Sequence, residues 1–280
     1  MKYLSKIEDK VKSNQALTKD DLFFLYEIDS KIEGFGHGDD PRVEELRRTR
    51  NPKEDAPIVF DCVPNEIAWD KREINEQTKA YIGKLDVKVF TLIEEYGIEQ
   101  VYTSFPDVRV ELEKDFEAQP ISLVEFERQR ELYNQQTVDE SQKIQITDYS
   151  KRMAEEIGEP EHPAIKEKET FTLIRIQVRS LFQDEQTHTT DEIFTKANEL
   201  GLELCPPEVG LIKRLQDTNQ PMGDWYIIAM KPITAQSGYP DIFYLVRCDH
   251  GLWLYDSYWA KPDYKWYLDN EFVFRLRKLT

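Results

Sequence analysis

Aromatic residues gather at the C-terminal end of this 280-residue chain. Four of its five tryptophans lie in the last quarter, at Trp225, Trp253, Trp259 and Trp266. They are interleaved with seven tyrosines: Tyr226, Tyr239, Tyr244, Tyr255, Tyr258, Tyr264 and Tyr267. Rings of this size either fill the core of a β unit or form an exposed surface for recognition. The stretch therefore predicts an aromatic-rich β structure at this end of the chain, and no other segment gives a comparably clear functional signal.

The composition predicts a folded, very soluble protein with an acidic surface. Hydrophobic residues make up 40% of the chain, which is enough for a core in one large domain or two modest ones. The 54 acidic and 37 basic residues give a formal net charge of -17. Such a surface repels phosphate backbones, so nucleic-acid binding is disfavoured. The same charge favours a basic protein partner and speeds its encounter.

Three observations predict a cytoplasmic protein without a membrane partner. The first twelve residues, MKYLSKIEDKVK, contain no apolar segment of the kind found in secretory signals. No run approaches the roughly 18 apolar residues that a membrane-spanning helix needs. The three cysteines, Cys62, Cys205 and Cys248, are sparse and far apart, which fits a reducing compartment better than a disulfide framework.

Residues 1–115 are predicted to form a helical unit that includes a short α/β segment. Near its start, Thr18 and Asp21 have the spacing of an N-cap followed by an acidic first turn. This helix should end before the glycine-rich segment 34–38. A glycine-rich loop can also hold a phosphate, but this one follows a helix and runs into two aspartates. A helix-ending loop is therefore the favoured interpretation.

The α/β segment is predicted from three consecutive patterns. Residues 57–62 are a short apolar run bounded by prolines, which is typical of a strand. Residues 85–96 have the helical spacing of apolar side chains and are followed by Gly97, a natural C-cap. Residues 98–103 predict the next strand. The order strand, helix, strand is compatible with a small α/β layer.

Residues 116–168 are predicted to be an acidic, partly helical connector. They are rich in Glu, Gln, Lys and Asp, and they contain helical patterns at 123–135 and 149–157. Residues 159–163 include two prolines, each of which disfavours helix in the residue before it. We therefore place a domain boundary before residue 169.

Residues 169–280 are predicted to form an aromatic-rich C-terminal domain. Thr189 and Glu192 have the spacing of a capping box at the start of its helix. Short β runs follow at 225–230, 242–246, 252–255 and 272–276, separated by turn signals. The predicted fold class is therefore α+β. It has a helical N-terminal unit with a short α/β segment, and a C-terminal small antiparallel sheet with one packed helix.

The aromatic residues of this domain form the candidate binding site. Alternate residues of a strand share one face, so Trp253 and Tyr255 should lie together. The predicted anchors and their acidic rim are Trp253, Tyr255, Trp259, Trp266, Asp256 and Asp263. The alternative interpretation is that the same rings fill the core of the β unit.

A thiol and imidazole pattern in the same domain suggests other chemistry. Cys248 and His250, together with Cys205 and His188, carry groups that ligate zinc or pair as nucleophile and base. No Cys-x-x-Cys motif accompanies them. A buried thiol beside an exposed turn is the favoured interpretation.

Clustered carboxylates near the N-terminus are a second chemical pattern. They are Asp39, Asp40, Glu44, Glu45, Glu54 and Asp55. Carboxylates of this kind bind a divalent cation or act as general acid and base, but their spacing does not match a calcium loop. In a chain this acidic, a solvated face is the favoured interpretation.

Several segments carry a family resemblance. They are LTKDDLFFLYEIDSKIEGFG (Leu17–Gly36), INEQTKAYIGKL (Ile74–Leu85), IEQVYTSFPD (Ile98–Asp107), TTDEIFTKANELGLELCPPEVG (Thr189–Gly210), GDWYIIAMKPI (Gly223–Ile233), GLWL (Gly251–Leu254) and FVFRLRK (Phe272–Lys278). Together they resemble a family of uncharacterised bacterial proteins. The resemblance implies that the C-terminal unit from about Phe171 is a module. The family has no established activity, so the resemblance assigns no catalytic residue.

The leading hypothesis is a non-enzymatic cytoplasmic module that binds a protein partner through its aromatic C-terminal face. One alternative is a metal-dependent hydrolase that uses Asp39, Asp40, Glu44 or the pair Cys248 and His250. Another alternative is a small-ligand or carbohydrate-binding protein that uses the same tryptophans. No cofactor and no catalytic residue is predicted, and the oligomeric state is left open.

Overall fold

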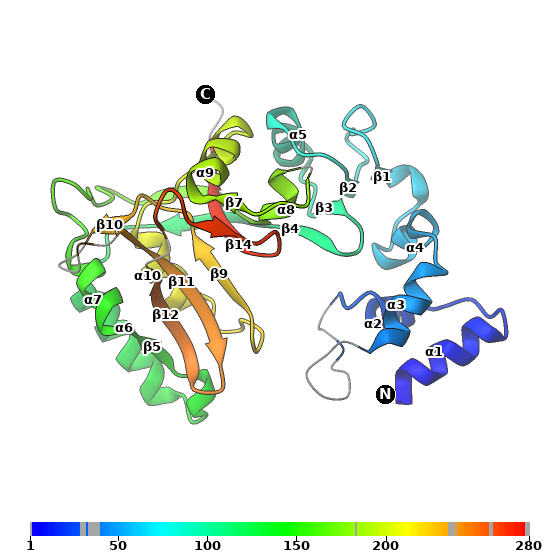
Figure 1. Ribbon diagram of the computed structural model, residues 1–280, viewed down its shortest axis with the longest axis horizontal. Helices are drawn as coiled ribbons and strands as arrows, with labels where there is room; N and C mark the ends of the chain where they lie inside the picture. Colours follow the sequence, from blue (N-terminus) through cyan, green and yellow to red (C-terminus); the bar gives the residue numbers. More distant parts are fainter. Residues whose placement is uncertain are drawn as a thin grey trace. The chain divides into compact units, whose positions relative to one another are not determined.

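The computed structural model describes residues 2–28, 32, 40–182, 184–234, 238, 240–257 and 260–277. Within these ranges the chain forms ten α-helices and a large mixed sheet of twelve strands (Figure 1). Two compact units divide the chain: Met1–Lys84 with Thr91–Arg109, and Leu85–Phe90 with Val110–Thr280. Three of the twelve strands belong to the first unit and nine lie mainly in the second. Helix α5 (Val87–Tyr96) contributes residues to both.

The first unit contains helices and three short parallel strands. Its elements are α1 (Lys2–Lys12), α2 (Lys19–Leu25), α3 (Pro41–Arg48), α4 (Pro52–Val59), the 3-10 turn η1 (Pro64–Glu66), β1 (Ile67–Ala68), β2 (Ala80–Ile82) and β3 (Gln100–Ser104). The predicted cap of α2 is confirmed. Thr18 Oγ1 accepts a hydrogen bond from the Asp21 N–H at 3.3 Å, and the Asp21 carboxylate accepts one from the Thr18 N–H at 2.8 Å.

The predicted strand at 57–62 is wrong, because residues 57–59 are helical in α4 and residues 60–62 form a turn. Asn51 caps that helix by accepting a hydrogen bond from the Lys53 N–H at 3.1 Å. Pro52 occupies the first helical position, where its missing N–H and fixed φ cost nothing. A complete helix start therefore precedes the apolar run and decides its conformation.

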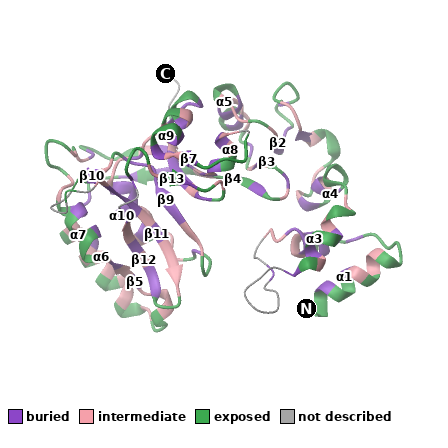
Figure 2. Cartoon of the chain, in the orientation of Figure 1, coloured by how far each residue is buried: buried purple, intermediate pink, exposed green. Residues whose placement is uncertain are grey.

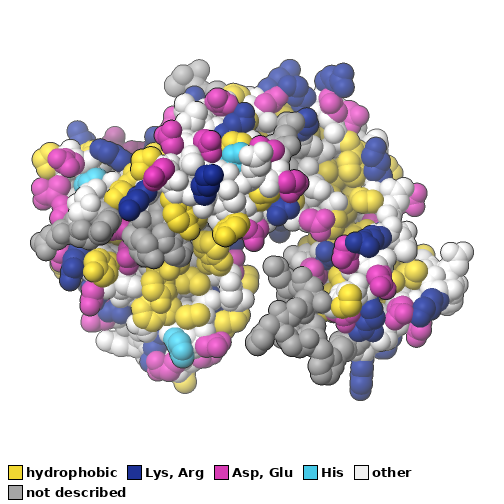
Figure 3. All heavy atoms as spheres, in the orientation of Figure 1, with side chains coloured by type: hydrophobic (Ala, Val, Ile, Leu, Met, Phe, Trp, Pro, Cys, Tyr) yellow, Lys and Arg dark blue, Asp and Glu magenta, His cyan; other side chains and the backbone are white. Residues whose placement is uncertain are grey.

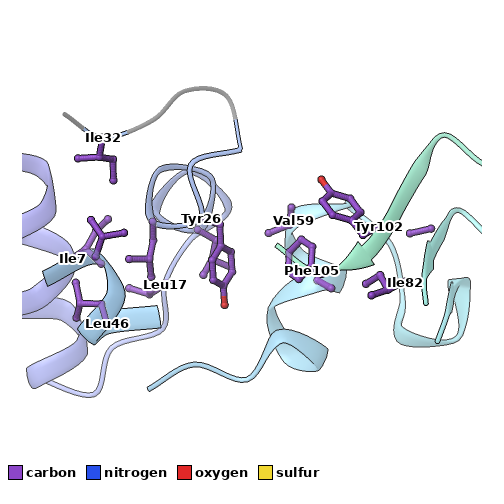
Figure 4. Packing of buried hydrophobic residues seen from close by; sticks show 14 of the residues in the cluster. Ile7, Leu17, Tyr26, Ile32, Leu46, Val59, Ile82, Tyr102 and Phe105 are labelled. Carbon is purple, nitrogen blue, oxygen red and sulfur yellow. The ribbon is translucent and has the colours of Figure 1, made fainter. Parts of the chain in front are cut away.

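The core of the first unit is apolar and rich in aromatic rings (Figure 4). Tyr26 and Tyr102 each meet Phe105 edge-on, with ring centroids 5.4 and 5.3 Å apart. Asp55 is buried in the same unit, where it accepts hydrogen bonds from the Tyr26 hydroxyl and from Arg50. The buried carboxylate is thus satisfied by two neighbours, as a buried charge requires.

The second unit is built on a mixed sheet. Its strand order is β4 (Val108–Ala118), β6 (Glu169–Gln177), β14 (Glu271–Leu276), β9 (Trp225–Ile228), β11 (Pro240–Cys248), β12 (Gly251–Ser257) and β5 (Ile144–Ile146). Two further strands, β8 (Leu202–Glu203) and β10 (Ile233–Thr234), pair with β14 and β11. A separate ribbon joins β7 (His188–Thr189) to β13 (Lys265–Trp266). The pairs β14–β9 and β12–β5 are parallel, and the other named pairs in this unit are antiparallel.

Helices pack on both faces of this sheet. The helical elements are α6 (Leu123–Gln136), η2 (Glu140–Gln142), α7 (Asp148–Glu155), α8 (Val178–Leu181), α9 (Thr190–Glu199) and α10 (Glu208–Gln216). Helix α10 contacts β11 and β12, and a Cβ placed on its Gly210 would lie 2.7 Å from the Phe243 ring. On the other face, Phe194 of α9 meets Phe272 and Phe274 of β14 edge-on. The predicted capping box of α9, Thr189 with Glu192, is confirmed.

The outer edge of β5 is covered by one side chain. Asn134 of α6 donates a hydrogen bond to the Ile144 carbonyl at 2.8 Å and accepts one from the Ile144 N–H, also at 2.8 Å. Its amide therefore takes the place of a neighbouring strand at this residue. Such pairing protects an edge that would otherwise offer free backbone groups to another chain.

The predicted fold class is wrong. The C-terminal sheet is not small, since two strands from earlier in the chain belong to it. It is not purely antiparallel either, since β5 pairs with β12 in parallel. Of the two earlier strands, one is β4, and the other is β5 from the predicted connector 116–168, which also supplies α6 and α7 to the second unit. None of the helices in the described ranges combines the length and apolarity that a bilayer crossing requires.

Candidate functional site

Five side chains form a half-buried apolar surface, here called the aromatic face, on β9, β11 and β12. They are Trp225, Tyr244, Val246, Trp253 and Tyr255. Strand alternation places them opposite to the buried residues that α10 covers, such as Phe243. The alternation of buried and intermediate residues is visible along β11 and β12 in Figure 2, and Figure 3 shows hydrophobic side chains gathered over these strands.

The rings of the aromatic face stand side by side as a ladder. Tyr244 and Tyr255 are directly paired across β11 and β12, and their rings stack with centroids 5.2 Å apart. Trp253 also stacks with Tyr255, with ring centroids 5.1 Å apart, while Trp225 meets Tyr244 edge-on at 6.4 Å. The central ring, Tyr255, is therefore stacked with two neighbours.

The aromatic face carries no charge of its own at neutral pH. Burial raises the pKa of Tyr244 to about 12, with a smaller contribution from Tyr255. Burial also raises the pKa of Tyr255 itself. Both hydroxyl groups are therefore protonated and remain able to donate and accept hydrogen bonds.

The structure brings together only part of the predicted site. Trp253 and Tyr255 lie on the aromatic face, whereas Trp266 is buried with 2% exposure and donates an indole hydrogen bond to Thr190 at 2.8 Å. Asp256 has the opposite parity and accepts a hydrogen bond from the Thr147 hydroxyl at 2.6 Å, at the start of α7. The remaining two residues are Asp263, which is exposed beyond the end of β12, and Trp259, which lies outside the described residues.

The thiols and imidazoles of the second pattern have separate surroundings. Cys205 is buried beside the Val273 carbonyl, and burial raises the pKa of its thiol. Cys248 is half-buried at the end of β11, with His250 exposed in the turn that follows. His188 is buried, with its ring stacked on Phe182 at 3.5 Å and its Nε2 2.8 Å from Asp184. In the described ranges, no three His, Cys, Asp or Glu side chains are arranged to hold a metal ion.

The described carboxylates of the N-terminal acidic set include several with structural partners. Asp40 caps α3 and pairs with Arg42 at 2.6 Å, and the hydrogen bond from Arg42 lowers the pKa of that carboxyl. Glu44 pairs with Arg48 one turn along the same helix. Residues 34–38 and Asp39 lie outside the described residues.

A second candidate site is a pocket of about 330 Å³ inside the second unit, here called the charged pocket. It opens between the C-terminal end of α10 and the strands β4, β6, β14 and β9. Its lining residues are Glu111, Leu112, Glu113, Leu173, Arg175, Lys213, Asp217, Pro221, Asp224, Tyr226 and Val273. This volume lies at the lower end of the roughly 300–1,000 Å³ range of small-molecule sites.

Arg175 organises one wall of the charged pocket. Its guanidinium donates to both oxygens of Asp224, including one hydrogen bond of 3.0 Å, and also to Glu271. The guanidinium carbon lies 4.4 Å from the ring centroid of Tyr226. Burial disfavours the charged form of Arg175, but the hydrogen bonds and charges of these carboxylates outweigh it and raise its pKa. Glu111 is more distant, 3.9 Å from the guanidinium.

The opposite wall is fixed by the end of α10. The Tyr226 hydroxyl donates to Asp217, and burial, followed by the Asp217 charge, keeps the pKa of this phenol well above its usual value. Arg214 is fully buried and bonds to the Asp217 carbonyl and to Gln220 at 2.7 Å, which anchors the loop after α10. Burial lowers the pKa of Arg214. Lys213 pairs with Glu113 at 2.7 Å across the pocket rim.

The sequence prediction missed the charged pocket. One signal was present: Arg175 has the same strand parity as the buried residues Phe171 and Leu173. A charge at an inward position of a strand indicates buried ionic partners. Those partners, however, come from three other segments of the chain, at Glu111, Asp224 and Glu271.

Comparison with known proteins finds no matching family model, no similar curated protein and no similar solved structure. The resemblance to uncharacterised bacterial proteins therefore stays a prediction, and the function has to be inferred from the aromatic face and the charged pocket themselves.

Proposed function

We propose that this chain is a protein-interaction module that docks a protein partner on the aromatic face. The observation that carries the proposal is the ladder of four rings on one side of β9, β11 and β12, which is only partly buried while helices cover the other side. Tryptophan and tyrosine are enriched among the residues that dominate protein-protein binding. Exposed apolar patches rimmed by polar groups are typical of such interfaces.

The partner we propose presents apolar side chains flanked by Lys or Arg. The aromatic face itself is uncharged, so its centre requires an apolar match. Around it, the chain has a net charge of -17, and the exposed Asp249 lies in the turn between β11 and β12. A basic rim on the partner complements this field and accelerates encounter. Binding should therefore weaken with salt but persist, because the apolar contacts are insensitive to screening.

The ring geometry favours a protein partner over a carbohydrate. A sugar stacks on an open ring face, whereas the Tyr255 ring is already stacked with Tyr244 and with Trp253. The side chains and backbone of a protein partner can contact ring edges and hydroxyl groups, so a protein does not require an open ring face. Tryptophan fluorescence titration with a panel of sugars separates the two, since a saturable response to a sugar would support the carbohydrate alternative.

We also propose a cytoplasmic location. Its support is that Cys62, Cys205 and Cys248 are all free thiols. Disulfides are rare in reducing compartments, where unpaired thiols persist.

The test is affinity capture of a partner by the full chain, followed by titration of that purified partner. Trp253→Ala removes one ring, and Val246→Lys places a charge between Trp225 and Trp253, the two residues that pair with Val246 on either side. Each should weaken binding roughly 30-fold, which is about 2 kcal/mol for a residue at the centre of an interface. Tyr149→Ala is the matched control, because this tyrosine is 50% exposed on α7.

Melting curves must first show that the variants fold. The proposal is contradicted if both face variants bind the partner as tightly as the parent chain. It is also contradicted if Tyr149→Ala weakens binding as strongly as they do, since the loss would then not be specific to the aromatic face.

A further inference from the structure

We propose that the charged pocket binds a small organic cation, namely an amine or guanidinium group carried on a short aliphatic body. This site is separate from the aromatic face. Strand alternation places Tyr226 on the α10 side of β9, whereas Trp225 belongs to the opposite side. The proposal therefore does not depend on the proposed protein docking.

The charge of the pocket selects a cation. Four carboxylates line it against two basic side chains: Glu111, Glu113, Asp217 and Asp224 against Arg175 and Lys213. Both basic groups are already paired, Arg175 with Asp224 and Lys213 with Glu113. An anion would have to break these pairs, whereas a cation meets carboxylates that still have capacity to accept hydrogen bonds from a charged donor.

Two of the carboxylates have that capacity. The nearest cation to Glu111 is Arg175 at 3.9 Å, and the Glu111 side chain is 52% exposed. Asp217 accepts a hydrogen bond from the neutral Tyr226 hydroxyl, and the nearby Arg214 guanidinium donates to the Asp217 backbone carbonyl rather than to its carboxylate. The hydroxyl fixes the orientation of Asp217 and leaves its other oxygen for a donor. An ammonium or guanidinium group there makes charge-assisted hydrogen bonds.

The remaining lining selects an organic body rather than a bare ion. Leu173 and Val273 come from the buried core of β6 and β14, and Pro221 adds a third apolar wall. A short chain of methylene groups would displace water from these surfaces. A metal ion would gain nothing from them, and its ligand requirement is not met among the described side chains.

The experiment is calorimetric titration of the full chain at low salt with 1,4-diaminobutane and with agmatine, which adds a guanidinium. Shape-matched controls are 1,4-butanediol, which is uncharged, and succinate, which is anionic. We expect saturable binding of at least one cation, at least tenfold tighter than either control. Absence of binding of both cations at millimolar concentration overturns the proposal, and so does equal affinity for the diol.

Variants separate the pocket from the acidic surface as a whole. Asp217→Asn keeps an acceptor for the Tyr226 hydroxyl but removes the charge. Glu111→Gln removes a charge at an exposed position that tolerates change. Each should weaken cation binding at least tenfold. Glu131→Gln, on the exposed side of α6, should leave it unchanged.

The variants can support or overturn the proposed cation site. If Asp217→Asn fails to fold, Glu111→Gln carries the test, because its side chain is not part of the core. Unchanged affinity in the pocket variants, or an equal loss in Glu131→Gln, would mean that the amines bind the acidic surface without a site and would overturn the proposal.

Discussion

Replacing Arg175 by methionine should destabilise the second unit by about 3 kcal/mol. Its side chain is 18% exposed, and its removal leaves Asp224 and Glu271, which are 18% and 23% exposed, without their cation. Breaking a buried ion pair from one side costs about 3–5 kcal/mol, and the partial exposure of both carboxylates moves the estimate to the lower end. Loss of the contact with the Tyr226 ring adds a fraction of a kcal/mol.

Urea unfolding followed by tryptophan fluorescence measures this effect, because four of the five tryptophans belong to the second unit. A compensated variant, Arg175→Met with Asp224→Asn and Glu271→Gln, should recover at least half of the loss, since no unpaired charge remains. Arg72→Met is the control, because the Arg72–Asp70 pair is on the surface, and its midpoint should not move. A loss below about 1 kcal/mol in Arg175→Met, or no recovery in the compensated variant, would refute the reasoning.

Three further predictions concern buried contacts outside the two candidate sites. Burial raises the pKa of Glu208, because the folded protein favours the neutral form of this side chain. The folded state is therefore fully stable at low pH and loses stability as Glu208 ionises at higher pH. Glu208→Gln, which cannot ionise, should melt at a higher temperature than the parent at pH 7 and at the same temperature at pH 4. Identical pH dependence of the two melting temperatures would contradict this. Gly210→Ala places a Cβ 2.7 Å from the Phe243 ring and should lower the free energy of unfolding, measured in urea, by about 1–3 kcal/mol. Adding Phe243→Leu should restore part of this free energy, because the smaller side chain relieves the clash. Asn134→Ala exposes the backbone N–H and carbonyl of Ile144 at the sheet edge and should lower the free energy of unfolding by about 1 kcal/mol. The exposed edge should also cause concentration-dependent self-association, measured by sedimentation velocity. A variant that stays monomeric at all concentrations would contradict the protection of this edge by Asn134.

Local signals predicted the parts of the fold that depend on neighbours in the sequence. The capping boxes at Thr18 and Thr189 both occur as expected, because an N-cap is decided within four residues. The run 57–62 failed because a stronger helix start, Asn51-Pro52, lies just upstream. The fold class failed because β5 joins β12 from over 100 residues away, and no local pattern encodes that parallel pairing.

The candidate site shows the same division. Strand alternation correctly placed Trp253 and Tyr255 on one face, since parity is a local property. Trp266 was predicted to be a binding anchor, but β13 pairs with β7 and brings its indole to Thr190 in the core. The charged pocket escaped prediction because its carboxylates and Arg175 come from separate strands, a loop and a helix end.

Hydroxyl-radical footprinting of the full chain, without and then with its captured partner, tests the aromatic face most directly. We expect Tyr244, Trp253 and Tyr255 to be oxidised several-fold faster than the buried Trp266 in the free chain, and to become protected in the complex. The exposed Tyr149 should react equally in both states. Slow oxidation of the three face residues in the free chain, or protection that falls elsewhere in the complex, would contradict docking on this surface.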